Sequence, residues 1–519
     1  MSDQQGAPGR PGPLPPLAGP RLAITAVALA LGTFMQVLDS SIANVSIPTI
    51  AGDLGVSTDQ GTWVITSFAV SNGISVPLTG WLMGRYGVVR TFVSSVVLFT
   101  LASFLCGIAW SLPVLIVARI LQGAVSGPMI PGSQALLISI FPSHRRGAAL
   151  AIWSLTTMVA PIGGPLLGGY ISDNYHWAWI FLINLPVGAV CAVLCWTNMR
   201  GRETTTRKLK VDTVGFGLLV VWVGALQIAL DTGKQADWFS SPAIVVLALV
   251  ALVGFIAWTI WELTDKAPIV DLSLFRSRNF VFGVLVMCVG YGVFFGNVVL
   301  QPLWLQTQLG YTATWAGLVA APGGLVAIAI TPLTSRMMAR FDARWTATLS
   351  IAAFGLSFWL RSLYPPDASF GVLVMPMLVQ GVGMAGFFVS TVTLALSGVA
   401  PAQLPNATGL SNFARITAGS FAASITTTLW DRREALHQTR LAETASATGS
   451  AWSAAVHGLG RVGLDGAHAA AAITQQFVGQ AYMLASLDFF RLSAWLMVAL
   501  TPFIWLTRRS VGGGSPVAD

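Results

Sequence analysis

Apolar stretches long enough to cross a bilayer decide the fold, and the clearest of them reads PAIVVLALVALVGFIAWTIWE at residues 242–262. A membrane-spanning helix needs roughly 20 predominantly apolar residues. Comparable runs recur almost end to end on both sides of this stretch. Of the 519 residues, 54% are hydrophobic and only 9% are charged, whereas about 25% are charged in an average soluble chain. The sequence therefore predicts an all-α polytopic membrane protein.

Fourteen such stretches are predicted to be transmembrane helices. Their approximate limits are 22–48, 61–84, 91–110, 113–136, 147–170, 179–198, 213–231, 242–262, 280–303, 315–338, 345–363, 371–396, 409–430 and 487–507. Residues 1–20 are rich in Pro and Gly and lack the basic-then-apolar order of a cleaved signal peptide. We therefore expect a disordered cytoplasmic tail, followed by a first helix that acts as an uncleaved signal.

The distribution of Lys and Arg predicts the orientation in the membrane. One set of loops holds most of them, including the run from Arg200 to Lys210, whereas the short opposite loops hold little beyond Lys234 and Arg361. Loops rich in Lys and Arg face the cytoplasm, so both termini are predicted to be cytoplasmic. Residues 431–486 then form a long periplasmic loop that is large enough to meet another protein. Because the net charge of +8 reflects topology, no nucleic-acid partner is expected.

A repeated pattern divides the chain into two related halves. Pro77-Leu78-Thr79 recurs as Pro332-Leu333-Thr334, and Gln122-Gly123 recurs as Gln380-Gly381 at nearly the same offset. Transporters are commonly built from repeats with the substrate site between them; chance matching in a biased sequence is the alternative. The predicted division is a tail at 1–20, a six-helix bundle at 21–199, two inserted transmembrane helices with flanking cytoplasmic loops at 200–279, a second six-helix bundle at 280–507 that includes the periplasmic loop 431–486, and a cytoplasmic tail at 508–519.

Four segments resemble signature motifs of the major facilitator superfamily. They are GWLMGRYGVVR at 80–90, RILQG at 119–123, APIGGPLLGG at 160–169 and LDSSIANVSIP at 38–48. The resemblance points to the fourteen-helix drug:proton antiporter branch and implies the superfamily fold in a 6+2+6 arrangement. In the first motif it implies conformational roles for Gly80, Arg85, Gly87 and Arg90. The family usually has an acid where this chain has Gly84, so the family's acid-based gating contact has no carboxylate at that position.

Three further segments resemble the EmrB subfamily, as does the long loop before the last helix. They are TFMQVLD at 33–39, YHWAW at 175–179 and SNFAR at 411–415. The resemblance implies export of hydrophobic drugs and uncouplers in exchange for protons across the bacterial inner membrane. It also implies a tripartite system with an EmrA-like periplasmic adaptor and a TolC-like outer-membrane channel. No cofactor beyond the proton gradient is expected, since no nucleotide-binding loop or metal-ligand spacing appears in the sequence.

Asp39 and Arg119 are the predicted proton-coupling residues, because each lies inside an apolar span. Ionisable residues are expensive within the bilayer and tend to be functional there. Burial favours a neutral carboxyl group and a neighbouring cation favours the carboxylate, so an acid held between these influences can take up and release a proton. Arg119 stays charged and can respond to that change. The alternatives are a structural ion pair for Asp39 and a snorkelling role for Arg119.

Two other features of the spans are candidates for function. Arg415 shares a helical face with Asn412, and the sequence leaves three roles open for it: a counterpart of Arg119 in the other half, a group that binds an anionic substrate, or a structural pin. The Gly- and Pro-rich segment is predicted to form a bent, closely packed helix that seals the pathway against proton leak, with a simple packing kink as the alternative. Its conformational residues are Pro161, Gly164, Pro165, Gly168 and Gly169.

A broad-specificity substrate cavity requires side chains that re-pack around different ligands, which Met and aromatic residues do well. The candidates of this kind are Phe34, Met35, Tyr291, Phe294, Phe295, Trp304, Phe387 and Phe388, and the polar candidates are Gln36, Asn44, Gln122, Asn412 and Arg415. Taken singly, each aromatic residue is more often a core or lipid-facing residue.

Three functions compete on this evidence. The first is a drug:proton antiporter, and the second is an exporter of one natural metabolite, a lipid or a siderophore on the same fold, since fold alone does not settle substrate. The third is a membrane enzyme or a scaffold. The absence of a nucleophile, metal or nucleotide constellation in the sequence weighs against an enzyme.

Overall fold

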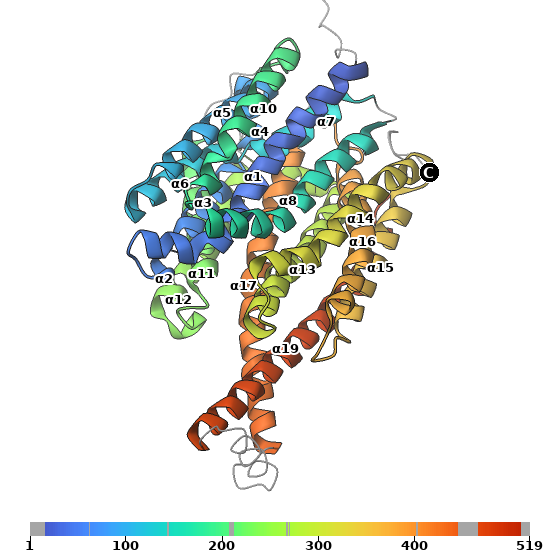
Figure 1. Ribbon diagram of the computed structural model, residues 1–519. Coiled ribbons are helices and arrows are strands. Elements are labelled where there is room, and N and C mark those ends of the chain that lie inside the picture. Colours follow the sequence, from blue (N-terminus) through green and yellow to red (C-terminus); the bar gives the residue numbers. More distant parts are fainter. Residues whose placement is uncertain are drawn as a thin grey trace, which may run out of the picture.

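The computed structural model describes residues 16–509 apart from 62, 143–144, 207–211, 266–267, 269, 401–402 and 445–465. Every regular element in these ranges is a helix (Figure 1). The sequence dictates this outcome, because backbone groups in a lipid environment must be satisfied within the segment itself and a helix does so.

The first half of the chain forms a bundle around α1 and α8, which pack closely along their lengths. Its elements are α1 (Gly19–Asp53), α2 (Thr58–Gly61), α3 (Trp63–Ser75), α4 (Thr79–Tyr86), α5 (Val88–Gly107), α6 (Leu112–Ser126), α7 (Met129–Ile140), α8 (Arg146–Asn174), α9 (Trp179–Leu182) and α10 (Asn184–Met199). Breaks at Pro77 and Pro128 divide two of the predicted spans into the pairs α3/α4 and α6/α7.

The second half begins after two helices that pack on each other, and the first of them also packs on α3 and on α17 (Leu404–Thr444). These two are α11 (Thr213–Thr232) and α12 (Pro242–Thr264). The short helical turn η2 (Trp238–Ser240) follows α11, and the turn η3 (Leu272–Arg276) follows α12. The remaining elements are α13 (Arg278–Gln308), α14 (Ala313–Arg340), α15 (Ala343–Arg361), α16 (Phe370–Leu396), α17 (Leu404–Thr444) and α19 (Gly466–Trp505).

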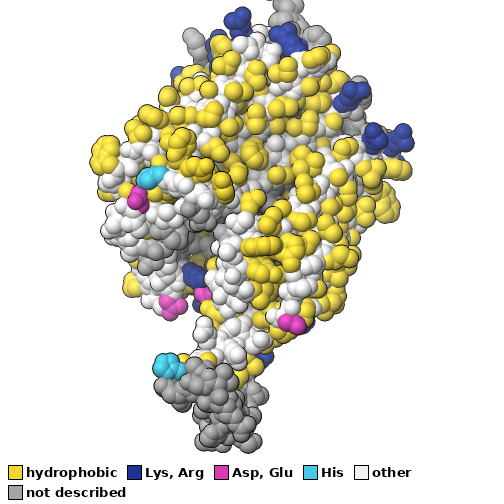
Figure 2. Space-filling view, in the orientation of Figure 1, with side chains coloured by type: hydrophobic (Ala, Val, Ile, Leu, Met, Phe, Trp, Pro, Cys, Tyr) yellow, Lys and Arg dark blue, Asp and Glu magenta, His cyan; other side chains and the backbone are white. Residues whose placement is uncertain are grey.

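The surface is that of a multi-pass membrane protein. Hydrophobic side chains cover the middle of the molecule, and most Lys and Arg on the visible face gather at the end where α1 begins (Figure 2). Within the described ranges, ten helices are long and apolar enough to cross a membrane. The number of fourteen spans therefore stays a prediction.

One packing detail recurs in both halves. A Cβ added at Gly123 on α6 would collide with the carbonyl oxygen of Phe68 on α3, and one at Gly381 on α16 would collide with that of Gly323 on α14. Phe68 and Gly323 are 255 residues apart, as are Pro77 and Pro332. Both Gln-Gly pairs therefore serve the same purpose, which is to let two helices approach closely.

The predicted connection 431–486, in which residues 467–485 are a candidate amphipathic helix by sequence, is helical in both of its described parts. Helix α17 continues to Thr444, and α19 starts at Gly466, so the two project from the bundle as a hairpin (Figure 1). The segment has the low hydropathy of a loop, but it is rich in Ala, which has a high helix propensity. At the base of the hairpin, Asp488 accepts a 2.9 Å contact from His437 and Arg433 lies 3.6 Å away. The tip lies outside the described residues.

Candidate functional site

Asp39 and Arg119 form an ion pair in the interior of the first bundle. Asp39 on α1 is 1% exposed and Arg119 on α6 is 0% exposed. The Nη1 of Arg119 donates to Oδ2 of Asp39 at 2.6 Å. The structure thus brings together the two residues predicted for coupling and excludes the snorkelling position for Arg119, whose guanidinium points inward.

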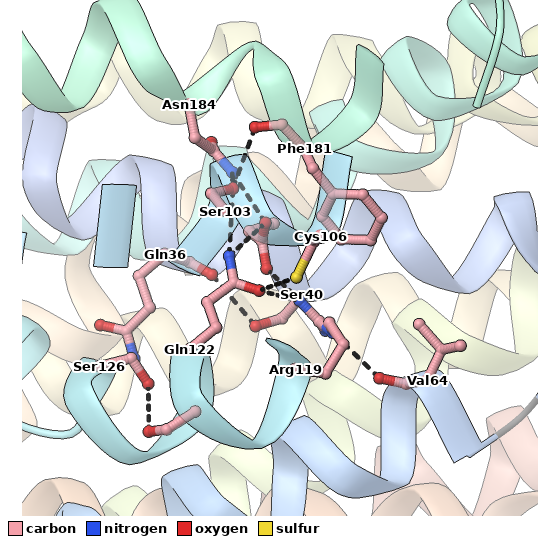
Figure 3. Close-up of polar contacts among 12 residues, drawn as sticks. Gln36, Ser40, Val64, Ser103, Cys106, Arg119, Gln122, Ser126, Phe181 and Asn184 are labelled. Carbon is pink, nitrogen blue, oxygen red and sulfur yellow. Dashed lines mark hydrogen bonds and ion pairs between the residues drawn. The ribbon is translucent and has the colours of Figure 1, made fainter. Parts of the chain in front are cut away.

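Three polar side chains complete the shell around this pair (Figure 3). Gln122 Nε2 and Asn184 Nδ2 both donate to Oδ1 of Asp39, at 3.1 and 2.8 Å. Each also donates to the hydroxyl of Ser103, at 3.2 and 2.9 Å. Both carboxylate oxygens are therefore satisfied by donors from α6 and α10. Asn184 and Ser103 were missed in the sequence, where a lone Asn or Ser in an apolar run carries no distinctive signal.

Arg119 is held from several sides as well. Its Nε donates to the carbonyl of Val64 at 3.0 Å and its Nη1 to Oε1 of Gln122 at 2.7 Å. The guanidinium also lies 4.2 Å from the ring centroid of Phe68 and 5.5 Å from that of Phe181. This position is fixed, so a proton on Asp39 would leave a buried cation without its counter-charge. Removing one partner of a buried ion pair costs about 3–5 kcal/mol.

Gln36 does not join this cluster. It is 2% exposed, and in the described part of the chain its Oε1 has no hydrogen-bond partner. Helix periodicity places Gln36 on the face of Asp39, but the described donors to the Asp39 carboxylate are Arg119, Gln122 and Asn184. Asn44 lies on the same helix, and its side chain is outside the described residues.

A second polar cluster lies between the two halves and centres on Arg415, which is 3% exposed. Its Nη2 donates to Oδ1 of Asn412 at 3.0 Å, and Asn412 donates to Oε1 of Gln134 on α7 at 2.7 Å. The guanidinium lies 4.6 Å from the ring centroid of Tyr291 and 5.7 Å from that of Trp153. No described acid pairs with Arg415, so it does not mirror the pair of Asp39 and Arg119.

The predicted cavity residues separate into two groups. Tyr291 and Phe295 stack with ring centroids 5.6 Å apart beside Arg415, and both are half-buried, as is Phe34. The others are fully packed core residues: Met35, Phe294, Trp304, Phe387 and Phe388. Aromatic and Met side chains are as useful for filling a core as for contacting a drug, so composition alone does not separate the groups.

The glycines of the Gly- and Pro-rich segment fit α8 against α1 next to Asp39. A Cβ added at Gly164 would lie 2.5 Å from Cβ of Ser41, and one at Gly168 would lie 2.9 Å from the carbonyl oxygen of Ile42. Gly169 is buried too. The segment is helical throughout, and the side chains of Pro161 and Pro165 are outside the described residues.

The segment 80–90 joins α4 to α5 and contacts α17 of the second half, at the end of the molecule opposite the hairpin (Figure 1). A Cβ at Gly80 would collide with Asn406 of α17, and Gly87 has a φ of +96°, which favours glycine. Arg85 and Arg90 are exposed, and Arg85 lies 5.4 Å from the ring centroid of Trp81.

Glu203, in the connector after α10, supplies a carboxylate to this same segment. Its Oε1 accepts from the backbone N–H of Val89 at 3.0 Å and its Oε2 from that of Arg90 at 2.9 Å. An acid at a helix N-terminus satisfies orphan donors and complements the helix dipole. The motif position at Gly84 has no acid, and a carboxylate reaches the loop from elsewhere in the chain.

We expect Glu203→Gln to release the connector from α5, because it removes the negative charge and one of the two acceptor oxygens. A loss of about 1 kcal/mol corresponds to roughly fivefold faster tryptic cleavage of the connector when local opening limits the rate. The readout is cleavage after Arg200 and Arg202 in purified protein. Glu443→Gln, at an exposed position, is the charge-matched control and should cleave like the wild type. Equal rates for both variants would show that Glu203 does not hold the connector.

Comparisons with known proteins also indicate a membrane transporter. A family model described as Major Facilitator Superfamily matches residues 29–423. Multidrug export protein EmrB of Escherichia coli (strain K12) is 47% identical over 500 residues, or 96% of this chain and 98% of that protein. Fatty acid resistance protein FarB of Neisseria gonorrhoeae is 44% identical over 503 residues, or 96% and 99%. The solved proton:xylose symporter XylE is 14% identical with a TM-score of 0.58, covering 93% of this chain and 96% of that one, and shows likeness of fold.

Proposed function

The chain belongs to the major facilitator superfamily and, within it, to the EmrB-like multidrug exporters, and from this premise we propose that it exchanges hydrophobic drugs for protons across the bacterial inner membrane. It is a multi-pass membrane transporter and not an enzyme. The proposal adds the proton gradient as the energy source, in place of a cofactor. It also adds the orientation, with both termini in the cytoplasm, which the gathering of Lys and Arg at one end of the molecule supports.

The buried pair of Asp39 and Arg119 carries the proposal of proton coupling. A proton that binds Asp39 cancels the attraction across 2.6 Å between α1 and α6, and its release restores that attraction. A ligand shifts a conformational equilibrium only through its different affinity for the two states. In this scheme the proton binds Asp39 with different affinities in the two conformations, and the drug binds between the two halves with different affinities in them.

Arg415 and its neighbours are proposed as the drug-contacting surface between the halves. The cluster draws on α7, α8, α13 and α17, so a ligand placed there touches both bundles. Tyr291 and Phe295 offer apolar faces next to a guanidinium. The direct test is drug movement by the purified chain in proteoliposomes, with the pH gradient imposed in either direction. Movement that ignores the gradient would contradict proton coupling.

A dedicated exporter of one anionic, lipid-like metabolite is the second candidate. Arg415 is buried without an acidic partner among the described residues, which favours an anionic ligand over a neutral one. The relative from Neisseria gonorrhoeae is named a fatty acid resistance protein. Competition by chemically unrelated drugs in the same proteoliposomes decides between the two, because a dedicated exporter would show a narrow profile.

We propose that the α17/α19 hairpin docks on an EmrA-like periplasmic adaptor, which connects the exporter to a TolC-like channel. The described ends of α17 and α19 project beyond the rest of the bundle (Figure 1), so a partner can reach them. Deleting residues 441–480 is expected to abolish drug resistance in cells and to leave transport in proteoliposomes intact. Resistance at the wild-type level after the deletion would remove the adaptor from the proposal.

A further inference from the structure

A small cavity in the second half lies between α13, α14 and α16, and its described lining includes no residue of the Arg415 cluster. Three of the lining residues are amides: Asn297 and Gln301 on α13, and Gln380 on α16. The other described lining residues are apolar or glycine, so the cavity carries no charge of its own. It has about 30 Å³ of room. One water needs roughly 10–15 Å³ on this measure, so the cavity admits about two waters or a polar group of similar size.

Each of the three amides is buried and has one polar atom without a hydrogen-bond partner in the described part of the chain. These atoms are Oδ1 of Asn297, Nε2 of Gln301 and Oε1 of Gln380. The exposed fractions of the three residues are 0%, 5% and 6%. Burying a polar atom without a partner is unfavourable, and native proteins seldom do so. Three such side chains around one cavity therefore indicate a ligand that supplies the missing partners.

The hydrogen bonds of Asn297 determine which kind of ligand fits. Its Nδ2 donates to the carbonyl of Val293 at 2.8 Å and to the hydroxyl of Ser493 at 3.0 Å. Its Oδ1 is therefore an acceptor that needs a donor from the ligand. Chloride and carboxylates only accept hydrogen bonds, and a cation finds no counter-charge among the described lining residues. The ligand group is thus neutral and carries at least one N–H or O–H donor.

The internal repeat shows that the packing of α13 does not require these amides. The Leu-Gly pairs that follow α1 and α13 lie 255 residues apart, and the glycine of each pair has a φ of +66°. At this offset Asn297 corresponds to Ile42 and Gln301 corresponds to Ser46. Ile42 is apolar, and the Ser46 hydroxyl is bonded to that of Ser172 at 2.8 Å. The unpartnered amides are therefore a feature of the second half alone.

The cavity adjoins the contact between the two halves. Its lining residue Gly317 on α14 faces Leu166 in the Gly- and Pro-rich segment of α8, and a Cβ added at Gly317 would lie 3.2 Å from Cβ of Leu166. Met377 and Met384 also line the cavity. Met side chains adapt to apolar groups of different shape. A ligand can therefore place its polar group among the amides and its apolar part along the Met side chains.

We infer that Asn297, Gln301 and Gln380 form a binding site for uncharged compounds that carry a primary carboxamide. This group offers two N–H donors, for Asn297 Oδ1 and Gln380 Oε1, and one carbonyl acceptor for Gln301 Nε2. These groups match the three unpartnered atoms in number and kind. That such compounds are exported rests on the proposed function, whereas their binding does not.

The test is the unfolding temperature of the purified chain in detergent, with benzamide or acetophenone at equal free concentrations. The two compounds have nearly the same shape, but acetophenone has a methyl group in place of the amino group and so lacks both donors. A ligand that binds the folded state raises the unfolding temperature in a saturating manner. We expect the apparent affinity for benzamide to exceed that for acetophenone by roughly tenfold or more, because acetophenone leaves the buried acceptors unpaired.

Two variants connect this response to the cavity. Gln380→Met keeps an unbranched side chain of similar length and removes the acceptor, so it should weaken the apparent affinity for benzamide by roughly tenfold. Gln475→Met makes the same exchange at an exposed position of α19 and should leave the benzamide response unchanged.

Equal responses of the wild type to the two compounds, or no response to either, would overturn the inference, since ordered water alone would then satisfy the amides. The same benzamide affinity in Gln380→Met and in the wild type would overturn it too, because benzamide would then bind elsewhere. If Gln380→Met does not fold, Gln301→Met takes its place with the same expected result and the same contradicting one. No gradient or drug is present, so a failure of benzamide binding leaves the proposed antiport standing, and a failure of antiport leaves benzamide binding standing.

Discussion

Asp39→Asn is expected to abolish uphill drug movement in proteoliposomes under an imposed pH gradient while the protein still binds drug. Asn has nearly the same shape as Asp, and its Oδ1 can still accept from Gln122 and Asn184, which donate at 3.1 and 2.8 Å in the wild type. It cannot take up or release a proton. The charge attraction to Arg119 is therefore absent in both conformations. The two conformations no longer differ in proton affinity at this position, so the pH gradient cannot shift the equilibrium between them.

The measurement combines drug uptake with proton flux and equilibrium drug binding. Asp431→Asn is the matched control, because Asp431 pairs with Lys234 at 2.9 Å at an exposed site, and exposed pairs contribute little. It should transport like the wild type. Arg119→Lys keeps the charge and loses the planar fork, so we expect a milder defect than from Arg119→Ala. Uphill transport at the wild-type rate with undiminished proton flux in Asp39→Asn would reduce Asp39 to a structural role.

The coupling residues of this site that could be predicted from the sequence share one property: each is a charged residue within an apolar stretch. Asp39 and Arg119 are charges inside apolar runs, and the bilayer makes such residues expensive. Their juxtaposition could be expected from that cost alone. Ser103 and Asn184 have no such contrast, because a hydroxyl or amide in an apolar helix is common, and only the packing of α5 and α10 shows that they reach the carboxylate.

The errors have a different physical origin. Within the segment 431–486, residues 467–485 are a candidate amphipathic helix by sequence, and α19 covers them. The continuation of α17 to Thr444 is not expected from its low hydropathy, because helix propensity depends on backbone and rotamer entropy and not on hydropathy. Arg361 lies near the end of the predicted span 345–363, where a charge is ordinarily solvated, and it is counted with the outer loops on that ground, whereas its side chain is buried. Its burial depends on α16 and α19, which lie later in the chain. Glu203 reaches the helix N-terminus at Val89 across 114 residues of sequence, a contact that no local pattern encodes.

Two adjacent glycines of α8 provide the second large effect, because they differ in the space beside them. A Cβ at Gly164 would lie 2.5 Å from Cβ of Ser41 and 3.0 Å from the backbone N of Ile42, whereas a Cβ at Gly163 has only Leu38 Cδ1 at 4.0 Å. Rotation of the Ser41 hydroxyl does not move its Cβ, and both this Cβ and the Ile42 backbone move only with α1. Since Asp39 lies on that helix, a shift of α1 also disturbs the 2.6 Å contact with Arg119.

We therefore expect Gly164→Ala to lower the free energy of unfolding by about 1–3 kcal/mol, the usual cost of overpacking, and to impair proton-coupled transport. Gly163→Ala should be neutral or stabilising by up to about 1 kcal/mol, because Ala is the better helix former. Both variants add one methyl group to neighbouring positions of one helix, so propensity and volume are matched. Denaturant unfolding in detergent and drug uptake in proteoliposomes give the two readouts. If Gly164→Ala matches Gly163→Ala in both, close approach of α1 and α8 does not maintain the coupling site, and the glycines are there for a different reason.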